Sequence, residues 1–268
     1  MKYAKQWKQN AFDLMNNIEA TQERQIEAVA ELFADTIQSG HLIHTFGCGH
    51  ANLPIEEMYP RIGGFVGFHP LCELPLTFFT HVRGEMGIDQ FLFLERCQDY
   101  ADAIFKGWNF DKQDVMWIFS HTGINAVNIE LALKAKEFGM KVVAFGSAKN
   151  CGENFGADKA RKSGHTSGKT LFEVADYVVD NCCPLQDASV EIEQWADEAH
   201  GIHNFIGPLS TIAFITNVWM TMGATAEILE KRGVKMYIHP SHNQPGDTTA
   251  RERLAECVEK YREVTQRC

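Results

Sequence analysis

Two continuously apolar segments joined by one helical segment constrain the fold more than any other part of this 268-residue chain. Residues 115–119 and 141–145 have the length and composition of strands that are buried on both faces. Residues 126–138 between them are rich in Ala, Leu, Lys and Glu, and Gly139 ends this helix. The unit is therefore strand, loop, helix and parallel strand. It predicts an α/β fold, a three-layer αβα sandwich with a parallel, Rossmann-like sheet.

The remaining segments extend this pattern over one domain, residues 1–268, because no repeat or linker divides the chain. Further strands are expected at residues 41–46, 65–68 and 177–180. The first forty residues are expected to form a pair of helices, the second starting near Thr21. Other helices are expected at residues 52–59 and 91–108, from Pro208 to 233, and at residues 248–264 near the C-terminus.

Composition excludes several classes of partner. Lys and Arg number 25 against 35 Asp and Glu, so the net charge is −10 at pH 7. An acidic chain is repelled by nucleic acids and anionic membranes, and neither is expected as a partner. The polar N-terminus and eight scattered cysteines without a C-x-x-C pair predict reduced thiols and a cytoplasmic location. The uncharged run at residues 205–226 contains several Ser, Thr and Asn residues, which favours a core or interface helix over a membrane span.

Small polar residues follow three of the predicted strands, where parallel sheets bind their ligands. After Phe119 come Ser120, Thr122, Gly123 and Asn125, with Asn125 at the start of a helix. Hydroxyl groups and free helix N–H groups can bind a phosphate without Lys or Arg. The same residues also suit an ordinary capped loop between a strand and a helix, so both interpretations stay open at this point.

The loop after Phe46 contains Gly47, Cys48, Gly49 and His50. It resembles half of a dinucleotide fingerprint, but the third glycine and the acidic residue after the next strand are missing. The sequence therefore predicts no nicotinamide cofactor, and no other cofactor is expected. A glycine turn that forms one wall of a ligand site remains.

Together these two loops resemble the phosphosugar-binding sugar isomerase (SIS) domain, and residues 163–169, 173–176 and 207–211 resemble a bacterial branch of sugar-isomerase-domain proteins. The resemblance implies that Ser120 and Thr122 surround a sugar phosphate. Two positions depart from the pattern, Ala51 where Ser is usual and His121 where a small residue or Asn is usual. The expected substrate-binding residues are Gly47, Cys48, Gly49, His50, Asn52, Ser120, Thr122, Gly123, Asn125 and Ser147.

The resemblance further implies aldose–ketose isomerisation through an enediol, which needs a base for a carbon-bound proton and an acid/base at oxygen. Glu95 is the first candidate for the base, since some enzymes with this domain use a Glu there, and Glu57 is the second. His165, in a Gly- and Ser-rich loop that could act as a lid, is the candidate acid/base. The alternatives are two surface carboxylates and a solvent-exposed loop histidine.

The same residues are compatible with other functions. The SIS domain also occurs in non-catalytic phosphosugar sensors and in amino-sugar-phosphate lyases or deglycases, and both stay as alternatives. The resemblance implies a homodimer or homotetramer. No metal is predicted, because His41 and His44 are expected on opposite faces of a strand. The pairs His200/His203 and His239/His242 have no obvious third ligand.

Overall fold

Five parallel strands form the central sheet of the computed structural model, in the order β2–β1–β3–β4–β5. The structure describes residues 1–77, 87–154, 162–196 and 200–268. The strands are β1 (Ile43–Gly47), β2 (Phe68–Pro70), β3 (Val115–Phe119), β4 (Lys141–Gly146) and β5 (Tyr177–Asp180). Every neighbouring pair is parallel, which confirms the predicted fold class.

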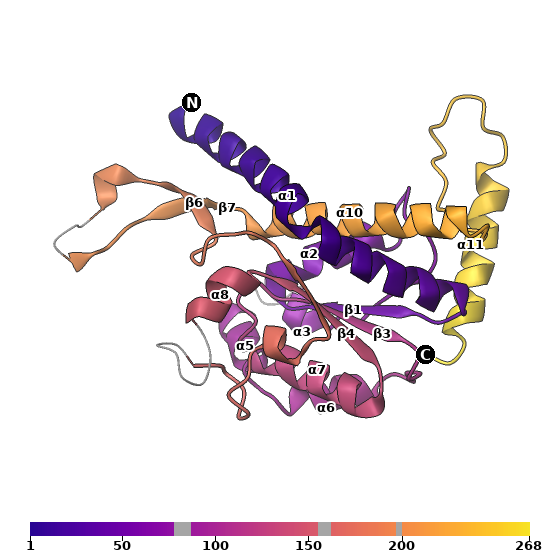
Figure 1. The fold of residues 1–268 in the computed structure, drawn as a ribbon, viewed down its shortest axis with the longest axis horizontal. Coiled ribbons are helices and arrows are strands. Elements are labelled where there is room, and N and C mark those ends of the chain that lie inside the picture. Colours follow the sequence, from indigo (N-terminus) through magenta and orange to yellow (C-terminus); the bar gives the residue numbers. More distant parts are fainter. Residues whose placement is uncertain (78–86, 155–161, 197–199) are drawn as a thin grey trace.

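Helices cover both faces of this sheet and complete the three layers (Figure 1). One face carries α1 (Lys2–Gln38) and α10 (Ser210–Lys231), and the other carries α6 (Tyr100–Lys106) and α7 (Ala126–Phe138). In β3, Trp117 packs into the core below α1 and α10, whereas Ile118 packs into the core beside α6 and α7. Successive strand side chains point to opposite faces, so a continuously apolar strand needs cover on both.

Shorter elements connect these layers. They are η1 (Gly49–Asn52), α2 (Leu53–Met58), α3 (Leu74–Thr77), α5 (Gly87–Leu94), α8 (Ala148–Asn154), α9 (Leu171–Val174), β6 (Ala188–Glu191), η3 (Glu193–Trp195), β7 (Phe205–Pro208) and α11 (Ala250–Thr265). β6 and β7 pair antiparallel and form a second sheet. This two-stranded sheet lies beside the N-terminal part of α1 (Figure 1), where Asn10 donates to the Ser189 carbonyl.

The predicted pair of N-terminal helices is wrong, because α1 is one continuous helix. No Gly or Pro occurs between Lys2 and Gln38 to interrupt it. Thr21, expected to start the second helix, lies inside α1, and its hydroxyl donates to the Asn17 carbonyl at 2.7 Å. Ile18 and Ile26, on either side of Thr21, are both buried in the same core. A single amphipathic face therefore runs through the predicted boundary.

A break near Glu95 replaces the single helix expected at residues 91–108. α5 ends at Leu94 and α6 begins at Tyr100. The Glu95 carbonyl is then free to accept the N–H of Val127, in the first turn of α7, at 3.2 Å. The interruption thus brings Glu95 to the start of α7.

α10 begins at Ser210 rather than at Pro208, which is the last residue of β7. Asp187 determines this start, because its carboxylate accepts the N–H groups of Leu209 and Ser210 and the Ser210 hydroxyl. By length and composition α10 could cross a membrane, and 44% of its most apolar window is buried. Its threonine hydroxyls, for example Thr221, donate to carbonyls one turn earlier, which lets polar residues occupy an apolar helix.

At the amino end of the sheet, a buried polar cluster joins β1 to the C-terminus of the chain. Asp114 accepts hydrogen bonds from Nε2 of His44 at 3.0 Å and from Arg267 at 2.5 and 2.6 Å. It also accepts the backbone N–H groups of Leu42 and Asp111. Burial alone would raise the pKa of Asp114, but these hydrogen bonds outweigh burial and hold that pKa well below its usual range.

His69 completes this cluster. Because Nε2 of His44 donates to a carboxylate, its Nδ1 accepts from Nδ1–H of His69 at 3.0 Å. Burial lowers the pKa of His44, and burial together with His44 lowers the pKa of His69 to about 4, so both rings are neutral at pH 7. We call Asp114, Arg267, His44 and His69 the amino-end network.

The expectation that His41 and His44 point to opposite faces of a strand is wrong. β1 begins only at Ile43, so strand alternation does not govern His41. Nδ1 of His41 lies 3.6 Å from the Asp114 carboxylate, and His44 contacts the other oxygen of the same group.

Candidate active site

A cavity of about 300 Å³ lies beyond the carboxyl ends of β1 and β3. The loop after β1, the loop after β3 with the first turns of α7, and the start of α10 supply most of its lining, and Glu95 and Asp187 complete it. Its lining residues are Cys48, His50, Ala51, Glu95, Phe119, Ser120, His121, Thr122, Asn125, Asn128, Asp187, Ser210 and Phe214. The cavity therefore occupies the edge of the sheet at which parallel α/β folds bind ligands.

The hydroxyl-bearing residues of the second loop line this cavity together. Ser120 is held in register by its N–H, which donates to the Phe145 carbonyl at 2.9 Å. Its Oγ accepts the Gly123 N–H at 3.2 Å, which leaves the hydroxyl hydrogen able to donate to a ligand. Thr122 is half-buried beside it. Both residues therefore line one cavity, Ser120 as a buried residue and Thr122 as a half-buried one.

Gly123 allows this loop to turn tightly. Its φ of +67° lies in the left-handed region, and a Cβ atom there would overlap the Phe172 ring. Its carbonyl accepts the Leu171 N–H at 2.8 Å, which ties the loop to the start of α9. Gly123 therefore shapes the loop and is not among the lining residues.

Glu95 is the carboxylate that faces the same cavity. It is 9% exposed, and its Oε2 accepts the Asn125 side-chain amide at 2.7 Å. Burial raises the pKa of Glu95, and Arg96 and the Asn125 hydrogen bond offset this only in part. A carboxylate with a raised pKa is suited to accept a proton and to return it.

Asn125 stands at the start of α7 but does not cap it with its side chain. The amide is directed to Glu95 instead. The first turn of α7 thus directs its partial positive charge toward the loop that carries Ser120 and Thr122. An anionic group in the cavity would be stabilised there.

The loop after β1 forms the opposite wall. Cys48 lines the cavity, and its thiol donates to Asn128 at 3.1 Å. Burial, with a smaller contribution from the Glu95 charge, raises the pKa of Cys48 well above its usual value, so this thiol stays protonated at pH 7. His50 lies exposed at the mouth of the cavity. A Cβ atom on Gly47 would overlap the Ala51 carbonyl, so only glycine lets β1 turn directly into η1.

Several residues predicted from the sequence lie outside this cavity. Gly49 begins η1, and Asn52 is buried with its side-chain amide donating to Glu56 at 2.8 Å. Glu57 pairs with Arg61, one turn along the chain, at 3.1 Å. Of the two candidate bases, the first, Glu95, lines the cavity, and the second, Glu57, does not.

His165 and Ser147 are also bonded elsewhere. His165 is 6% exposed, and its Nε2 lies 2.7 Å from Glu130 of α7 while its Nδ1 bonds Ser167. The Gly- and Ser-rich loop is thus bound to α7 in this structure. Ser147 is fully buried and donates to the Cys183 carbonyl at 2.7 Å. Neither residue lines the cavity.

The structure adds lining residues that the sequence did not single out, notably Asn128, Asp187 and Ser210. Asn128 lies in the first turn of α7, three residues after Asn125. Residues three apart share one face of a helix, so this spacing predicts that both line the same cavity. Asp187 carries no local signal, and Ser210 lies in the segment at residues 207–211, which showed the resemblance but assigned Ser210 no role. They reach the cavity because the loop before β6 caps α10.

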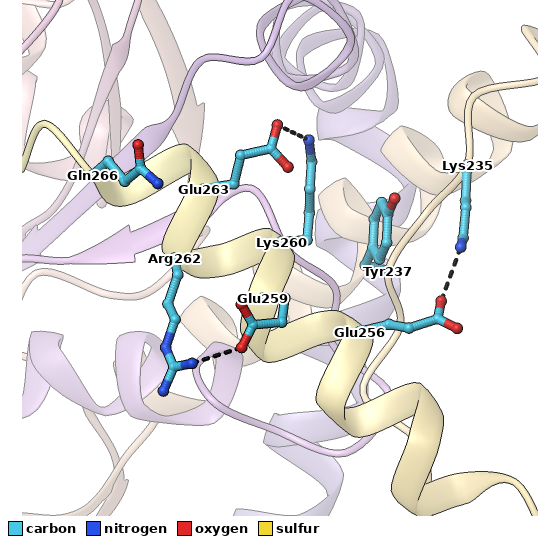
Figure 2. A pocket seen from close by; sticks show the side chains of 8 residues that line it. All are labelled: Lys235, Tyr237, Glu256, Glu259, Lys260, Arg262, Glu263 and Gln266. Carbon is cyan, nitrogen blue, oxygen red and sulfur yellow. Dashed lines mark hydrogen bonds and ion pairs between the residues drawn. The ribbon is translucent and has the colours of Figure 1, made fainter.

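A larger depression of about 570 Å³ lies between α11 and the segment at residues 235–237 (Figure 2). Its charged side chains pair with one another: Lys235 with Glu256 at 2.9 Å, Lys260 with Glu263 at 2.9 Å and Arg262 with Glu259 at 2.6 Å. It lies on the surface rather than at the carboxyl edge of the sheet. Size alone therefore does not identify the functional site, and we place it at the smaller cavity.

Comparison with known proteins agrees with this fold. The family model described as SIS domain matches residues 6–147. A UPF0309 protein of Oceanobacillus iheyensis is 30% identical over 263 residues, covering 98% of both chains. A UPF0309 protein of Thermoanaerobacter pseudethanolicus is 31% identical over 250 residues, covering 92% of this chain and 93% of the relative. The chain therefore belongs to the SIS domain family.

Solved structures to which the chain is similar include a phosphoheptose isomerase from Francisella tularensis. It has a TM-score of 0.48 and 12% identity, covering 82% of this chain and 94% of that one. The NanR protein of Vibrio vulnificus, solved with ManNAc-6P, has a TM-score of 0.42 and 9% identity, covering 94% of this chain and 66% of that one.

Proposed function

We propose that this protein binds a sugar phosphate in the cavity at the carboxyl ends of β1 and β3 and interconverts its aldose and ketose forms. The observation that carries the proposal is the placement of Glu95 in the same cavity as Ser120, Thr122 and the start of α7. Membership of the SIS domain family supports a phosphosugar as the ligand class.

The phosphate would bind at the loop after β3. Ser120 and Thr122 offer hydroxyl donors, and the first turn of α7 adds its partial positive charge. Hydrogen bonds to a charged acceptor contribute about 1.5–3 kcal/mol each, so a few such donors support binding without Lys or Arg. The sugar would then extend toward Glu95 and the wall formed by Cys48 and His50.

Glu95 would transfer the carbon-bound proton. Its carboxylate removes the proton from the carbon next to the carbonyl group, and the electron pair of that C–H bond forms the enediol. The proton then returns to the former carbonyl carbon, so the overall reaction moves two hydrogens and consumes no co-reactant. Two imidazoles line the cavity, those of His50 and His121, and Nε2 of His121 is bonded to the Leu185 carbonyl. His50 is therefore placed to exchange a proton at a sugar oxygen, whereas His165 is bonded to Glu130.

The proposal is tested first with a panel of aldose and ketose monophosphates. At a hundredfold excess over its dissociation constant, a ligand adds about 2.7 kcal/mol to stability, which for a chain of this size raises the Tm by about 5 °C or more. Proton NMR then follows conversion of each binder into its isomer. Binding without conversion would favour the phosphosugar sensor instead. Cleavage of an amino-sugar phosphate with release of its amine or another substituent would favour the lyase or deglycase.

Self-association is part of the same proposal. The sheet of β6 and β7, with the adjoining loop, exposes apolar side chains to solvent: Trp195 at 69%, Ile202 at 51%, Ile206 at 49% and Phe205 at 37%. Apolar groups gathered on a projecting element are typical of interaction surfaces. Sedimentation of the purified protein would show a homodimer or homotetramer if this expectation holds, and a monomer would contradict it.

A further inference from the structure

Three side chains of different chemistry converge at one edge of the candidate active site. His121 follows β3, and Cys183 and Asp187 lie in the loop between β5 and β6. One donor atom of each, an imidazole nitrogen, a thiol sulfur and a carboxylate oxygen, all lie within 4.8 Å of one another. Imidazole, thiolate and carboxylate together are the donor set that Zn²⁺ accepts.

The hydrogen bonds of His121 prepare it for this role. Its Nε2 donates to the Leu185 carbonyl at 3.2 Å, since a carbonyl can only accept. The neutral ring therefore keeps the lone pair on Nδ1, whose one partner among the described residues is the Asn181 side-chain amide at a long 3.4 Å. Metal-bound histidines almost always donate their other N–H to a carbonyl or carboxylate, which is the arrangement present here.

The loop that carries Cys183 and Asp187 is held firmly in place. The Cys183 side chain is fully buried, and its carbonyl accepts the Ser147 hydroxyl and the Asn150 amide. Asp187 has a φ of +65°, an uncommon conformation for a residue other than glycine. Its Oδ1 accepts two N–H groups at the start of α10, whereas its Oδ2 accepts one hydrogen bond within the described part of the chain, from the Ser210 hydroxyl at 2.8 Å. A lone pair on Oδ2 thus remains for a cation.

The charge of the cavity also favours a cation. Glu95 and Asp187 both line it, and none of its lining residues within the described ranges is Lys or Arg. A dianionic ligand would meet these two carboxylates at short range. A divalent cation beside Asp187 would offset that repulsion.

We propose that Nδ1 of His121, Sγ of Cys183 and Oδ2 of Asp187 bind one Zn²⁺ ion, with the fourth position open toward the cavity. His121 and Asp187 line the cavity, whereas Cys183 is fully buried and does not line it, so the open side of the ion would face the cavity. Three protein ligands with one open position are typical of catalytic rather than structural zinc. Binding releases the thiol proton of Cys183 to solvent. The site does not depend on the isomerase reaction, since it rests on the donor set alone.

The test uses the full chain after dialysis against a chelator, with Co²⁺ as the spectroscopic probe for Zn²⁺. We expect one equivalent of Co²⁺ to produce a thiolate-to-cobalt charge-transfer band, and one equivalent of Zn²⁺ to abolish it. Cys183→Ser should remove the band, and Asp187→Asn should weaken affinity by more than the roughly 10–100-fold caused by losing an outer partner. Cys257→Ser, which alters another buried thiol on α11, should leave the titration unchanged.

Absence of the charge-transfer band in the wild type would overturn the proposal. So would a Cys183→Ser protein that keeps the band. If Cys183→Ser does not fold, the wild-type spectrum and the Asp187→Asn titration still decide, because neither needs that variant.

Discussion

The two ends of the central sheet bury acidic side chains in opposite ways. In the amino-end network, Asp114 is bonded to Arg267, His44 and two backbone N–H groups, and its pKa is held well below the usual range. At the carboxyl end, Glu95 is bonded to one side-chain amide, and burial raises its pKa. The first carboxylate is fully satisfied and closes the fold. The second is left with capacity to bind or to exchange a proton, which separates a structural site from a functional one.

The largest expected effect is the loss of catalytic rate in Glu95→Gln. If Glu95 is the base, the rate of aldose–ketose conversion should fall about 10²–10⁴-fold, as for removal of a general base. Stability should be unchanged or slightly higher, because a neutral amide removes the cost of burying a charge. Conversion is measured by NMR and stability by urea unfolding. Glu137→Gln, a surface change on α7, is the control and should alter neither value.

Asp114→Asn should lower stability and leave the binding of sugar phosphate unchanged. It leaves Arg267 without its buried partner, and breaking a buried pair costs about 3–5 kcal/mol of unfolding free energy. Sugar-phosphate affinity should be unchanged at a temperature where the variant is folded. Asp102→Asn, which removes an exposed pair with Lys134, should cost no more than about 1 kcal/mol. Equal losses in the two variants would contradict a structural role for the amino-end network.

Thr122→Val keeps the side-chain shape and removes one hydroxyl from the proposed phosphate site. We expect affinity for the phosphorylated sugar to fall about 10–100-fold, equivalent to the roughly 1.5–3 kcal/mol of a hydrogen bond to a charged group. Isothermal titration calorimetry measures this, and thermal unfolding without ligand checks that the fold is intact. Unchanged affinity would place the phosphate elsewhere in the cavity.

The smallest effect concerns pH. Asp114 has a lowered pKa in the folded state, so its contribution to stability is present above the unfolded value near 3.9 and is lost as pH falls below it. Between pH 4 and pH 3 the wild type should lose about 1 kcal/mol more than Asp114→Asn. Urea unfolding at several pH values measures the difference, which should vanish if Asp114 is already protonated in the folded protein.

Much of the fold could be predicted because local patterns determine it. β3 and α7 have the bounds that the apolar run and Gly139 indicated, and the loops after β1 and β3 meet as expected of a parallel sheet. The prediction of a strand at residues 65–68 was less accurate. Phe65 forms an antiparallel bridge to Ile238 instead, and β2 begins only at Phe68. That partner lies far along the chain, and periodicity contains no information about it.

The candidate site was predictable only in part, for the same reason. Ser120 and Thr122 carry a local signal, because hydroxyls after a buried strand and before a helix suit a ligand loop. Asp187 is held at the cavity by its hydrogen bonds to the start of α10. His165 lies outside the cavity, with its Nε2 bonded to Glu130 of α7. Pairings across the fold decide both cases, and sequence spacing cannot show them.

Exchange of solvent deuterium tests the central claim most directly. Each binding sugar phosphate is incubated with the protein in deuterium oxide, and the carbon next to the carbonyl group is examined by NMR. We predict deuterium at that carbon with the wild type and none above background with Glu95→Gln. Tight binding with no deuterium incorporation, or equal incorporation by both proteins, would contradict Glu95 as the base in this cavity.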